Sequence, residues 1–301
     1  FGFGDGCNYI ASDVPAILKY TRDVAYLNDG DMVIFTDHDA LFFDGAGDPI
    51  TKTPEHITWD TEAAEKGGYE HFMLKEIHEQ PKAIRDTLSP RMKDGKIVLD
   101  DITLSADYLR NLRRVYAVAC GSAYYVGVQS KYIIEKLCQV PVEPVLASEF
   151  RYSDPVLGAD TLVLIISQSG ETADTLAALR LAKEKGARTL AIVNVVGSSI
   201  AKLADDVIYT WAGPEIAVAT TKAYSTQLAV VDLLALYMAQ CLGTVEPKRF
   251  DYLYGELQSL PEKVEQVLDD SVIEKIQYYA SRYFNNRDVF YIGRNLDSAT
   301  C

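Results

Sequence analysis

Residues 167–174 read SQSGETAD and stand between an apolar run and a helical stretch. The apolar run, residues 162–166, shows no polar alternation, which is typical of a parallel strand covered on both faces. Hydroxyl side chains, one amide and the free N–H groups of a helix start would meet where this strand ends. The segment is therefore predicted to bind an anion such as phosphate without a lysine. The alternative is an ordinary helix cap, because Ser, Thr and Asp are common caps in any protein.

Further apolar runs alternate with helical stretches from residue 113 onward. Together with residues 162–166 they predict a doubly wound, flavodoxin-like α/β fold with a five-stranded parallel sheet. The other runs are residues 115–120, 141–146, 190–195 and 206–209. Ligands of such sheets bind at the carboxyl ends of the strands. Polar segments after three of these ends are therefore expected to face one crevice; they are Gly121-Ser122, residues 167–169 and Gly197-Ser198-Ser199.

The composition limits the classes of function. With 301 residues, 48% of them hydrophobic, the chain is long enough for about two compact domains. A formal net charge of −14 argues against nucleic-acid binding, because affinity for phosphate backbones depends on clustered Lys and Arg. The longest apolar stretch, residues 228–238, contains Asp232 and is shorter than the roughly 20 residues that cross a membrane. No membrane segment is predicted.

Cysteine and histidine residues give no sign of a metal centre. The five cysteines are odd in number and lack CxxC spacing, so neither a disulfide framework nor a zinc site is predicted, and a reducing cytoplasm is favoured. His71 and His78 share a helical face but have no evident third ligand. No metal or cofactor is therefore predicted.

The beginning of the chain favours β-structure, with strand candidates at residues 31–36 and 40–44. A charged stretch with helical spacing follows at residues 60–91. We expect it to be a connector that ends or kinks at Pro81 and Pro90.

A weak internal repeat relates residues 109–122 to residues 279–294, since each has a helix end, a basic residue, an apolar strand and a glycine. Either the likeness is chance or a second copy of the α/β module begins near Ser271 and stops at its first strand. Because the chain opens on Phe1 instead of Met and stops at Cys301, we expect it to be part of a longer protein.

A second polar cluster precedes an apolar helix expected at residues 224–242. It consists of Thr220, Thr221 and Lys222. This cluster either faces the predicted anion site or forms a capping turn with a solvated lysine.

The sequence resembles a known family at several motifs. Residues 167–175 resemble the signature of the sugar isomerase (SIS) domain. Segments at residues 10–13, 68–81, 119–122 and 147–152 resemble the glutamine–fructose-6-phosphate aminotransferase family. The resemblance implies a glutaminase domain of the N-terminal-nucleophile type joined to two SIS domains. It also implies that glutamine amide nitrogen is transferred to fructose 6-phosphate, giving glucosamine 6-phosphate and glutamate.

The resemblance also implies where the domains lie. Residues 1–55 would be the C-terminal part of the glutaminase domain, and residues 56–112 a linker with leading helices. Residues 113–243 would be the first SIS domain. Helices and the start of a truncated second SIS domain would occupy residues 244–301.

The resemblance further implies a set of site residues: Ser122, Ser167, Gln168, Ser169 and Thr172 would hold the sugar phosphate. Val218 would lie beside the sugar. The family often has a Thr-Ser pair where this chain has Ser122-Ala123, so Ala123 could contact a ligand only through its backbone N–H. No catalytic residue is assigned, because the family's cysteine nucleophile and its isomerising Glu, His and Lys match no position here. The family implies a homodimer.

Two other functions remain open for a chain with this signature. A non-catalytic sugar-phosphate sensor is one, but such regulators carry a basic helix-turn-helix, and the segment before the SIS signature is β-rich and acidic. A sugar-phosphate isomerase or deaminase with two SIS modules is the other. That reaction has no use for a glutaminase remnant at the start of the chain.

Overall fold

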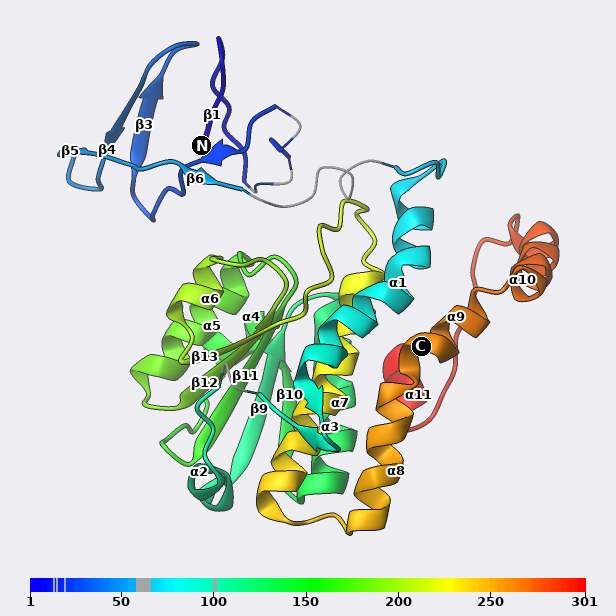
Figure 1. The fold of residues 1–301 in the computed structure, drawn as a ribbon. Helices are drawn as coiled ribbons and strands as arrows, with labels where there is room; N and C mark the ends of the chain where they lie inside the picture. The colour runs from blue at the N-terminus through cyan, green and yellow to red at the C-terminus, as the bar shows by residue number, and fades with distance from the viewer. Residues whose placement is uncertain (13, 15, 19, 58–65, 100–101) are drawn as a thin grey trace. The chain divides into compact units, whose positions relative to one another are not determined.

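A computed structural model describes the chain except for residues 13, 15, 19, 58–65 and 100–101 (Figure 1). The chain divides into two compact units, Phe1–Lys75 and Glu76–Cys301. Each unit is described by itself. The last position of the 10–13 motif and the expected start of the charged connector near residue 60 lie outside the described residues.

The first unit is built from short antiparallel strands. One sheet joins β1 (Gly2–Phe3), β2 (Asp23–Val24) and β6 (Glu55–His56), and another joins β3 (Met32–Phe35), β4 (Ala40–Phe43) and β5 (Pro49–Ile50). The strands predicted at residues 31–36 and 40–44 are confirmed by β3 and β4. Phe1 packs edge to face against Phe3, Phe35 and Phe42 at centroid distances of 5.0–5.3 Å.

The second unit contains the predicted parallel sheet. Its five strands lie in the order β10-β9-β11-β12-β13, and all pairs are parallel. The bounds are β9 Arg114–Ala119, β10 Val142–Leu146, β11 Thr161–Ser167, β12 Arg188–Val193 and β13 Asp206–Tyr209. In chain order β9 is the first strand of this sheet and β10 the second, and β10 lies at the edge, on one side of β9. The third strand, β11, pairs with the other side of β9, so the strand order reverses between β9 and β11. This is the doubly wound, flavodoxin-like arrangement, and its switch point lies at the carboxyl ends of β9 and β11.

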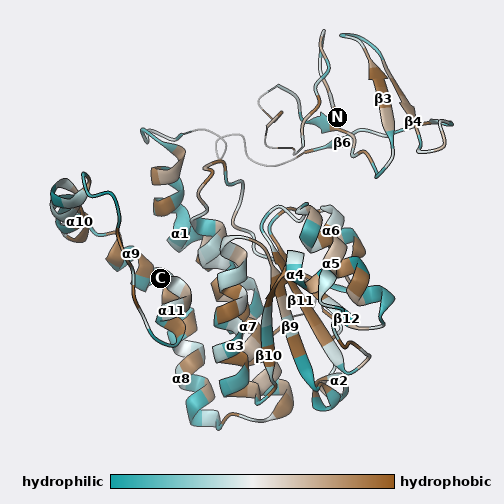
Figure 2. Cartoon of the chain, turned by 180° about the vertical axis from the view of Figure 1, so that it is seen from behind, coloured by the Kyte–Doolittle hydropathy of each residue, from teal (hydrophilic) through white to brown (hydrophobic). Residues whose placement is uncertain are grey.

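Helices cover both faces of the sheet (Figure 1). One face carries α3 (Ser122–Cys138) and α7 (Lys222–Leu242), and the other carries α4 (Ala147–Tyr152), α5 (Ala173–Glu184) and α6 (Ser199–Leu203). Alternate residues of each strand enter different cores: on β9, Ala117 packs towards α3 and α7, and Val118 towards α4 and α5. Figure 2 shows these central strands as strongly hydrophobic. Covered faces explain why the strand sequences lack polar alternation.

Helix α1 (Phe72–Leu88) continues through Pro81, so of the two predicted outcomes, an end or a kink, the end does not occur. Proline lacks the N–H that would bond the carbonyl four residues earlier, which belongs to Ile77. The side-chain amide of Gln80 donates to that carbonyl at 3.0 Å and replaces the missing bond. Pro90 lies in a 3-10 turn after the helix.

A short segment connects α1 to the sheet. It contains the 3-10 turn Ser89–Arg91, the hairpin β7 (Met92–Lys93) and β8 (Lys96–Ile97), and α2 (Ala106–Asn111). Ser105 caps α2, because its hydroxyl accepts from the N–H of Tyr108 at 3.1 Å.

Helix α7 is longer than the apolar stretch that the sequence analysis considered. It has 21 residues and by length and composition alone could cross a membrane. That is weak evidence for a span, since core helices of soluble proteins pass the same test. In its most apolar window 61% of residues are buried inside the protein, and the helix packs along α3.

Asp232 on α7 gives a pH prediction. Burial raises the pKa of its carboxyl to about 7, whereas an Asp in an unfolded chain titrates near pH 4. Between these values the folded state binds more protons than the unfolded state, so this group makes stability fall as the pH rises from about 4 to 7. The free energy of unfolding of Asp232→Asn, relative to that of the wild type, should therefore rise by on the order of 2–3 kcal/mol between pH 5 and pH 8. Urea unfolding of both proteins at the two pH values measures this; a difference independent of pH would contradict it.

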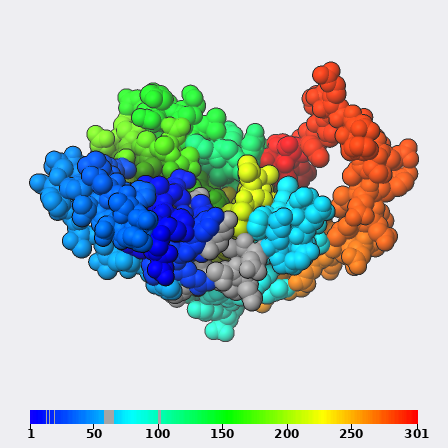
Figure 3. Space-filling view, turned by 90° about the horizontal axis from the view of Figure 1, so that it is seen from above, coloured from blue at the N-terminus to red at the C-terminus, as the bar shows by residue number. Residues whose placement is uncertain are grey.

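The C-terminal part consists of helices. They are α8 (Pro247–Gln258), α9 (Leu260–Val267), α10 (Asp270–Tyr283) and α11 (Leu296–Thr300). The strand expected near residues 289–292 is not formed in the structure, where Phe290 and Ile292 are 89% and 91% exposed. A strand needs a neighbouring strand for its hydrogen bonds, and the described part of the chain supplies none at this position. Figure 3 shows the orange part of the chain standing out from the green body of the same unit, whereas the red C-terminal end lies against that body.

Candidate functional site

A cavity of about 350 Å³ lies at the switch point of the sheet, where β9 and β11 end. Its walls come from the start of α3, the loop between β11 and α5, and the segment that leads into α7. The lining residues are Cys120, Gly121, Ser122, Ala123, Ile166, Ser167, Gln168, Ser169, Thr172, Thr175, Glu215, Ala217, Val218, Thr220 and Gln227. Every residue that the sequence analysis assigned to the sugar phosphate is among them.

The loop after β11 places its hydroxyls through local hydrogen bonds. Ser167 Oγ accepts from the N–H of Gly170 at 3.1 Å and lies 3.5 Å from Thr172 Oγ1. Ser169 Oγ accepts from the N–H of Glu171 at 3.2 Å. Thr172 is the N-cap residue of α5, but its side chain makes no capping hydrogen bond among the described residues. The ordinary cap therefore does not explain the Thr172 hydroxyl, which lies at the cavity.

The segment at residues 197–199 contacts the loop after β11. A Cβ on Gly170, whose φ is +69°, would lie 2.1 Å from Ser198 Oγ. The carbonyl of Gly170 accepts from the N–H of Ile200 at 3.0 Å. The expectation that Gly197, Ser198 and Ser199 face the crevice is wrong: they are absent from its lining, and Ser198 and Ser199 contact the loop instead.

Two helices begin at the cavity, and in the described part of the chain neither start has a side-chain cap. Helix α3 begins at Ser122 after Gly121, whose φ of +58° turns the chain, and it has no side-chain cap. Helix α5 begins directly after Thr172, also without a side-chain cap. The first N–H groups of a helix carry partial positive charge and lack partners within the helix, so both starts favour an anion.

The start of α7 is already occupied by a carboxylate. Glu215 accepts from the N–H of Thr221 at 2.8 Å, from the N–H of Ala223 at 3.2 Å and from Thr220 Oγ1 at 2.8 Å. An anion is therefore better placed at α3 and α5 than at α7.

Dipoles, not cations, dominate the described lining, which contains neither Lys nor Arg. Two carboxylates stand on the loop and at the start of α5, but each has its own partner. Glu171 accepts from the N–H of Ser199 at 2.7 Å, and Asp174 lies 3.5 Å from Arg151. These contacts reduce the repulsion that the two carboxylates would exert on a bound phosphate.

The predicted polar cluster before α7 is divided by the structure. Thr220 lines the cavity, but Lys222 is buried and its Nζ donates to Glu79 on α1 at 2.6 Å. A neighbouring carboxylate, Glu76, accepts from the N–H groups of Ile216 and Ala217 at 2.6 and 3.1 Å. Helix α1 thus fixes the wall of the cavity next to Val218, which neither interpretation of the cluster foresaw.

Sequence reasoning missed several lining residues, among them Thr175, Glu215 and Gln227. Thr175 is the last residue of the segment that resembles the SIS signature, but no role was predicted for it. Gln227 could have been recognised from the sequence as a candidate site residue, because it is a polar residue early in an otherwise apolar helix.

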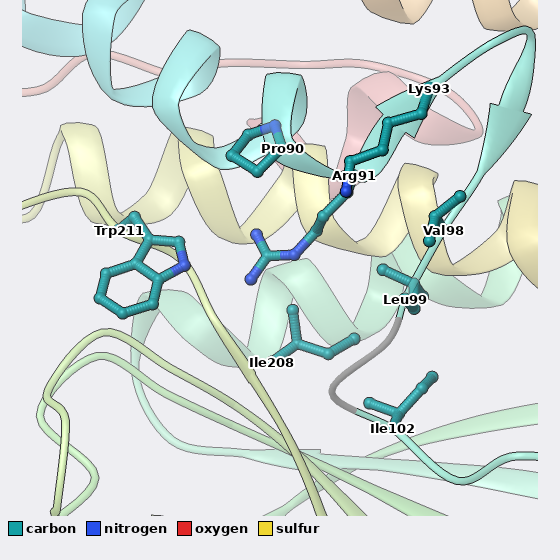
Figure 4. Close-up of a pocket in the computed structure, with 8 residues that line it drawn as sticks. All are labelled: Pro90, Arg91, Lys93, Val98, Leu99, Ile102, Ile208 and Trp211. Carbon is teal, nitrogen blue, oxygen red and sulfur yellow. The ribbon is translucent and has the colours of Figure 1, made fainter.

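A second cavity of about 170 Å³ lies beside the edge strand β13. Figure 4 shows the guanidinium of Arg91 between Trp211 and Ile208. This guanidinium donates to the carbonyls of Thr87 and Tyr209, each at 2.8 Å. Arg91 thereby joins the end of α1 to the sheet edge, and the described lining of this cavity has no hydroxyl side chain.

The chain is similar in sequence to known proteins. A family model described as "SIS domain" matches residues 108–237. The chain is 52% identical over 299 residues to a glutamine–fructose-6-phosphate aminotransferase (isomerizing) from Clostridium acetobutylicum. It is 53% identical over 299 residues to a protein of the same name from Caldanaerobacter subterraneus subsp. tengcongensis. Each alignment covers 99% of this chain and 49% of the relative, so the chain spans about half the length of the curated relatives it matches.

A solved structure agrees with the sequence comparison. The C-terminal domain of glucosamine-fructose-6-phosphate aminotransferase from Francisella tularensis superposes with a TM-score of 0.72 at 36% identity. The superposition covers 77% of this chain and 64% of that one. The sheet order and the loop after β11 agree with the SIS domain matched at residues 108–237, and nearly the whole chain is similar to about half of a glutamine–fructose-6-phosphate aminotransferase.

Proposed function

We propose that the cavity at the switch point binds fructose 6-phosphate, and that the protein transfers the amide nitrogen of glutamine to this sugar. The products are glucosamine 6-phosphate and glutamate. One observation carries the proposal: Ser167, Ser169 and Thr172 line a cavity next to the uncapped starts of α3 and α5. Such a cradle suits a phosphate ester, because hydroxyls and helix N–H groups can satisfy its oxygens without a cation.

The role of the cavity in the reaction is to hold the phosphosugar in position. With the phosphate fixed near Thr172, the open-chain ketose extends towards Val218. Ammonia kept apart from bulk water attacks the C2 carbonyl, and loss of water gives an imine at C2. Proton transfer from C1 to C2 then converts the C1 hydroxyl into an aldehyde and completes the isomerisation. We assign no proton-transfer group to this chain.

We also propose the domain organisation and the setting. Residues 1–55 form the C-terminal part of a glutaminase domain, and residues 56–112 form the linker and leading helices. The first SIS domain occupies residues 113–243, and a second begins within residues 244–301. The proposed setting is a cytoplasmic homodimer that uses glutamine and fructose 6-phosphate, with no nucleic acid, membrane or cofactor involved.

A sugar-phosphate isomerase or deaminase, or a non-catalytic sensor, is the competing function. The β-rich unit before the SIS domain favours the aminotransferase, because neither competitor needs it. The deciding experiment supplies the full-length protein with fructose 6-phosphate and either glutamine or no nitrogen donor. Glucosamine 6-phosphate formed only with glutamine supports the proposal, whereas isomerisation without glutamine, or binding without turnover, favours a competitor.

Removal of the Thr172 hydroxyl should weaken sugar-phosphate binding. Thr172→Val keeps the shape of the side chain but cannot bond a phosphate oxygen. A hydrogen bond to a charged group contributes about 1.5–3 kcal/mol, so the Kd for fructose 6-phosphate should rise roughly 10- to 100-fold. Calorimetric titration measures this, with Thr172→Ser as the control that keeps the hydroxyl. Equal affinity of the Val variant and the wild type would refute Thr172 as an anchor.

A further inference from the structure

Gln227 lies about one turn into α7 and lines the wall of the cavity that faces the phosphate-binding loop. Its side chain is 2% exposed, and within the part of the chain that the structure describes its Nε2 has no hydrogen-bond partner. A buried amide without a hydrogen-bond partner lowers the stability of the folded protein by about 1–3 kcal/mol, so its presence needs a physical reason.

Two other glutamines of the same unit have hydrogen-bond partners for their side-chain amides. Gln240, also on α7, accepts from the N–H of Ile97 at 3.0 Å and donates to its carbonyl at 3.1 Å. Gln80 donates to the carbonyl of Ile77 and accepts from Ser225. Gln227 is different, because it lines the cavity and its Nε2 has no hydrogen-bond partner among the described residues.

The two walls of the cavity differ in chemistry. The loop after β11 and the starts of α3 and α5 offer hydroxyls and helix N–H groups, which suit a phosphate. On the α7 wall, the carboxylate of Glu215 accepts from three donors, one of which is the hydroxyl of Thr220. The neutral carboxamide of Gln227 therefore supplies an unused donor on that wall, and a carboxamide can both donate to and accept from a sugar hydroxyl.

We propose that Gln227 is a sugar-binding residue, whose carboxamide recognises a hydroxyl or carbonyl oxygen of the phosphosugar and not its phosphate. This assignment rests on the proposed function and extends it to the sugar end of the ligand. A ligand oxygen at Nε2 satisfies the buried donor, and the apolar surroundings of α7 strengthen that bond.

Gln227→Met tests the assignment, since methionine has similar length and no hydrogen-bonding amide. Three quantities are measured on the whole chain: the Kd for fructose 6-phosphate, the Kd for inorganic phosphate and the urea midpoint of the free protein. Fructose 6-phosphate should bind about 5- to 10-fold more weakly, which corresponds to one neutral hydrogen bond. Phosphate binding should not change, and the urea midpoint should stay or rise because an unsatisfied amide has been removed.

Gln240→Met is the matched control and should show the opposite result: a lower urea midpoint with unchanged fructose 6-phosphate binding. Unchanged sugar-phosphate affinity in Gln227→Met overturns the assignment, and so does an equal loss for inorganic phosphate. The wild-type titration judges the proposed function separately. A wild-type chain that binds fructose 6-phosphate no more tightly than inorganic phosphate contradicts that function, and with it a sugar contact at Gln227.

Discussion

Gly170→Ala should abolish sugar-phosphate binding and lower the stability of the second unit. At a φ of +69° an alanine is strained by about 1–2 kcal/mol. The new Cβ would also lie 2.1 Å from Ser198 Oγ and 2.6 Å from Ser198 Cβ, so the loop or α6 must move. Overpacking of this kind costs about 1–3 kcal/mol. Because Gly170 N–H bonds to Ser167 Oγ, movement of the loop removes the hydroxyls from the positions that meet the phosphate.

Gly186→Ala is the control for backbone strain alone. Gly186 follows the C-terminal end of α5 with a φ of +79°, and a Cβ there meets open space. This variant should lose only about 1–2 kcal/mol and keep its affinity for fructose 6-phosphate. Adding Ser198→Gly to Gly170→Ala should restore part of the lost stability, because it removes the atoms that clash. Urea unfolding and titration of the four proteins decide the matter; Gly170→Ala with the stability and affinity of Gly186→Ala would show that the contact with Ser198 is unimportant.

Asp206→Ala should lower the free energy of unfolding by about 3–5 kcal/mol, because it breaks a buried network instead of a surface ion pair. The side chain of Asp206 is 1% exposed at the start of β13. One of its oxygens accepts from Thr103 N and Oγ1 at 2.7 and 2.8 Å, and the other accepts from Arg188 Nε and Nη2 at 2.9 and 2.8 Å. In the Ala variant, Arg188 loses the carboxylate that balances its charge, and the backbone N–H of Thr103 loses its hydrogen-bond acceptor.

Asp107→Ala serves as the comparison. Asp107 pairs with Arg110 at 2.6 Å, but its side chain is 89% exposed, and pairs of this kind contribute about 0–1 kcal/mol. Chemical denaturation monitored by circular dichroism compares the two variants. Equal losses in Asp206→Ala and Asp107→Ala would contradict the role given to the buried network at the edge of the sheet.

The sequence predicted those parts of the structure that depend on local pattern. Strands covered on both faces must be apolar throughout, so the run that became β11 was recognisable and its helix start followed at Thr172. The position of the site also followed, because parallel strands bring their carboxyl ends to one edge. The resemblance to a known family then supplied residues that no spacing would have chosen, such as Val218.

Features that depend on tertiary partners were not predictable in this way. The side-chain amide of Gln80 replaces the backbone hydrogen bond that Pro81 cannot make, and α1 continues through Pro81. Helix propensities of single residues do not describe such a side-chain hydrogen bond. Ser198 was expected at the crevice because it follows a strand end, but close packing against Gly170 takes it elsewhere. Residues 289–292 have the composition of a strand and form none, because composition does not supply a neighbouring strand.

A crystal structure of the chain with bound fructose 6-phosphate tests the central claim most directly. The account predicts the phosphate within hydrogen-bond distance of the hydroxyls of Ser167, Ser169 and Thr172, with the sugar extending towards Gln227. Electron density for the phosphate in the other cavity, against Arg91 and Lys93, would contradict it, because cations and not helix dipoles would then hold the ligand.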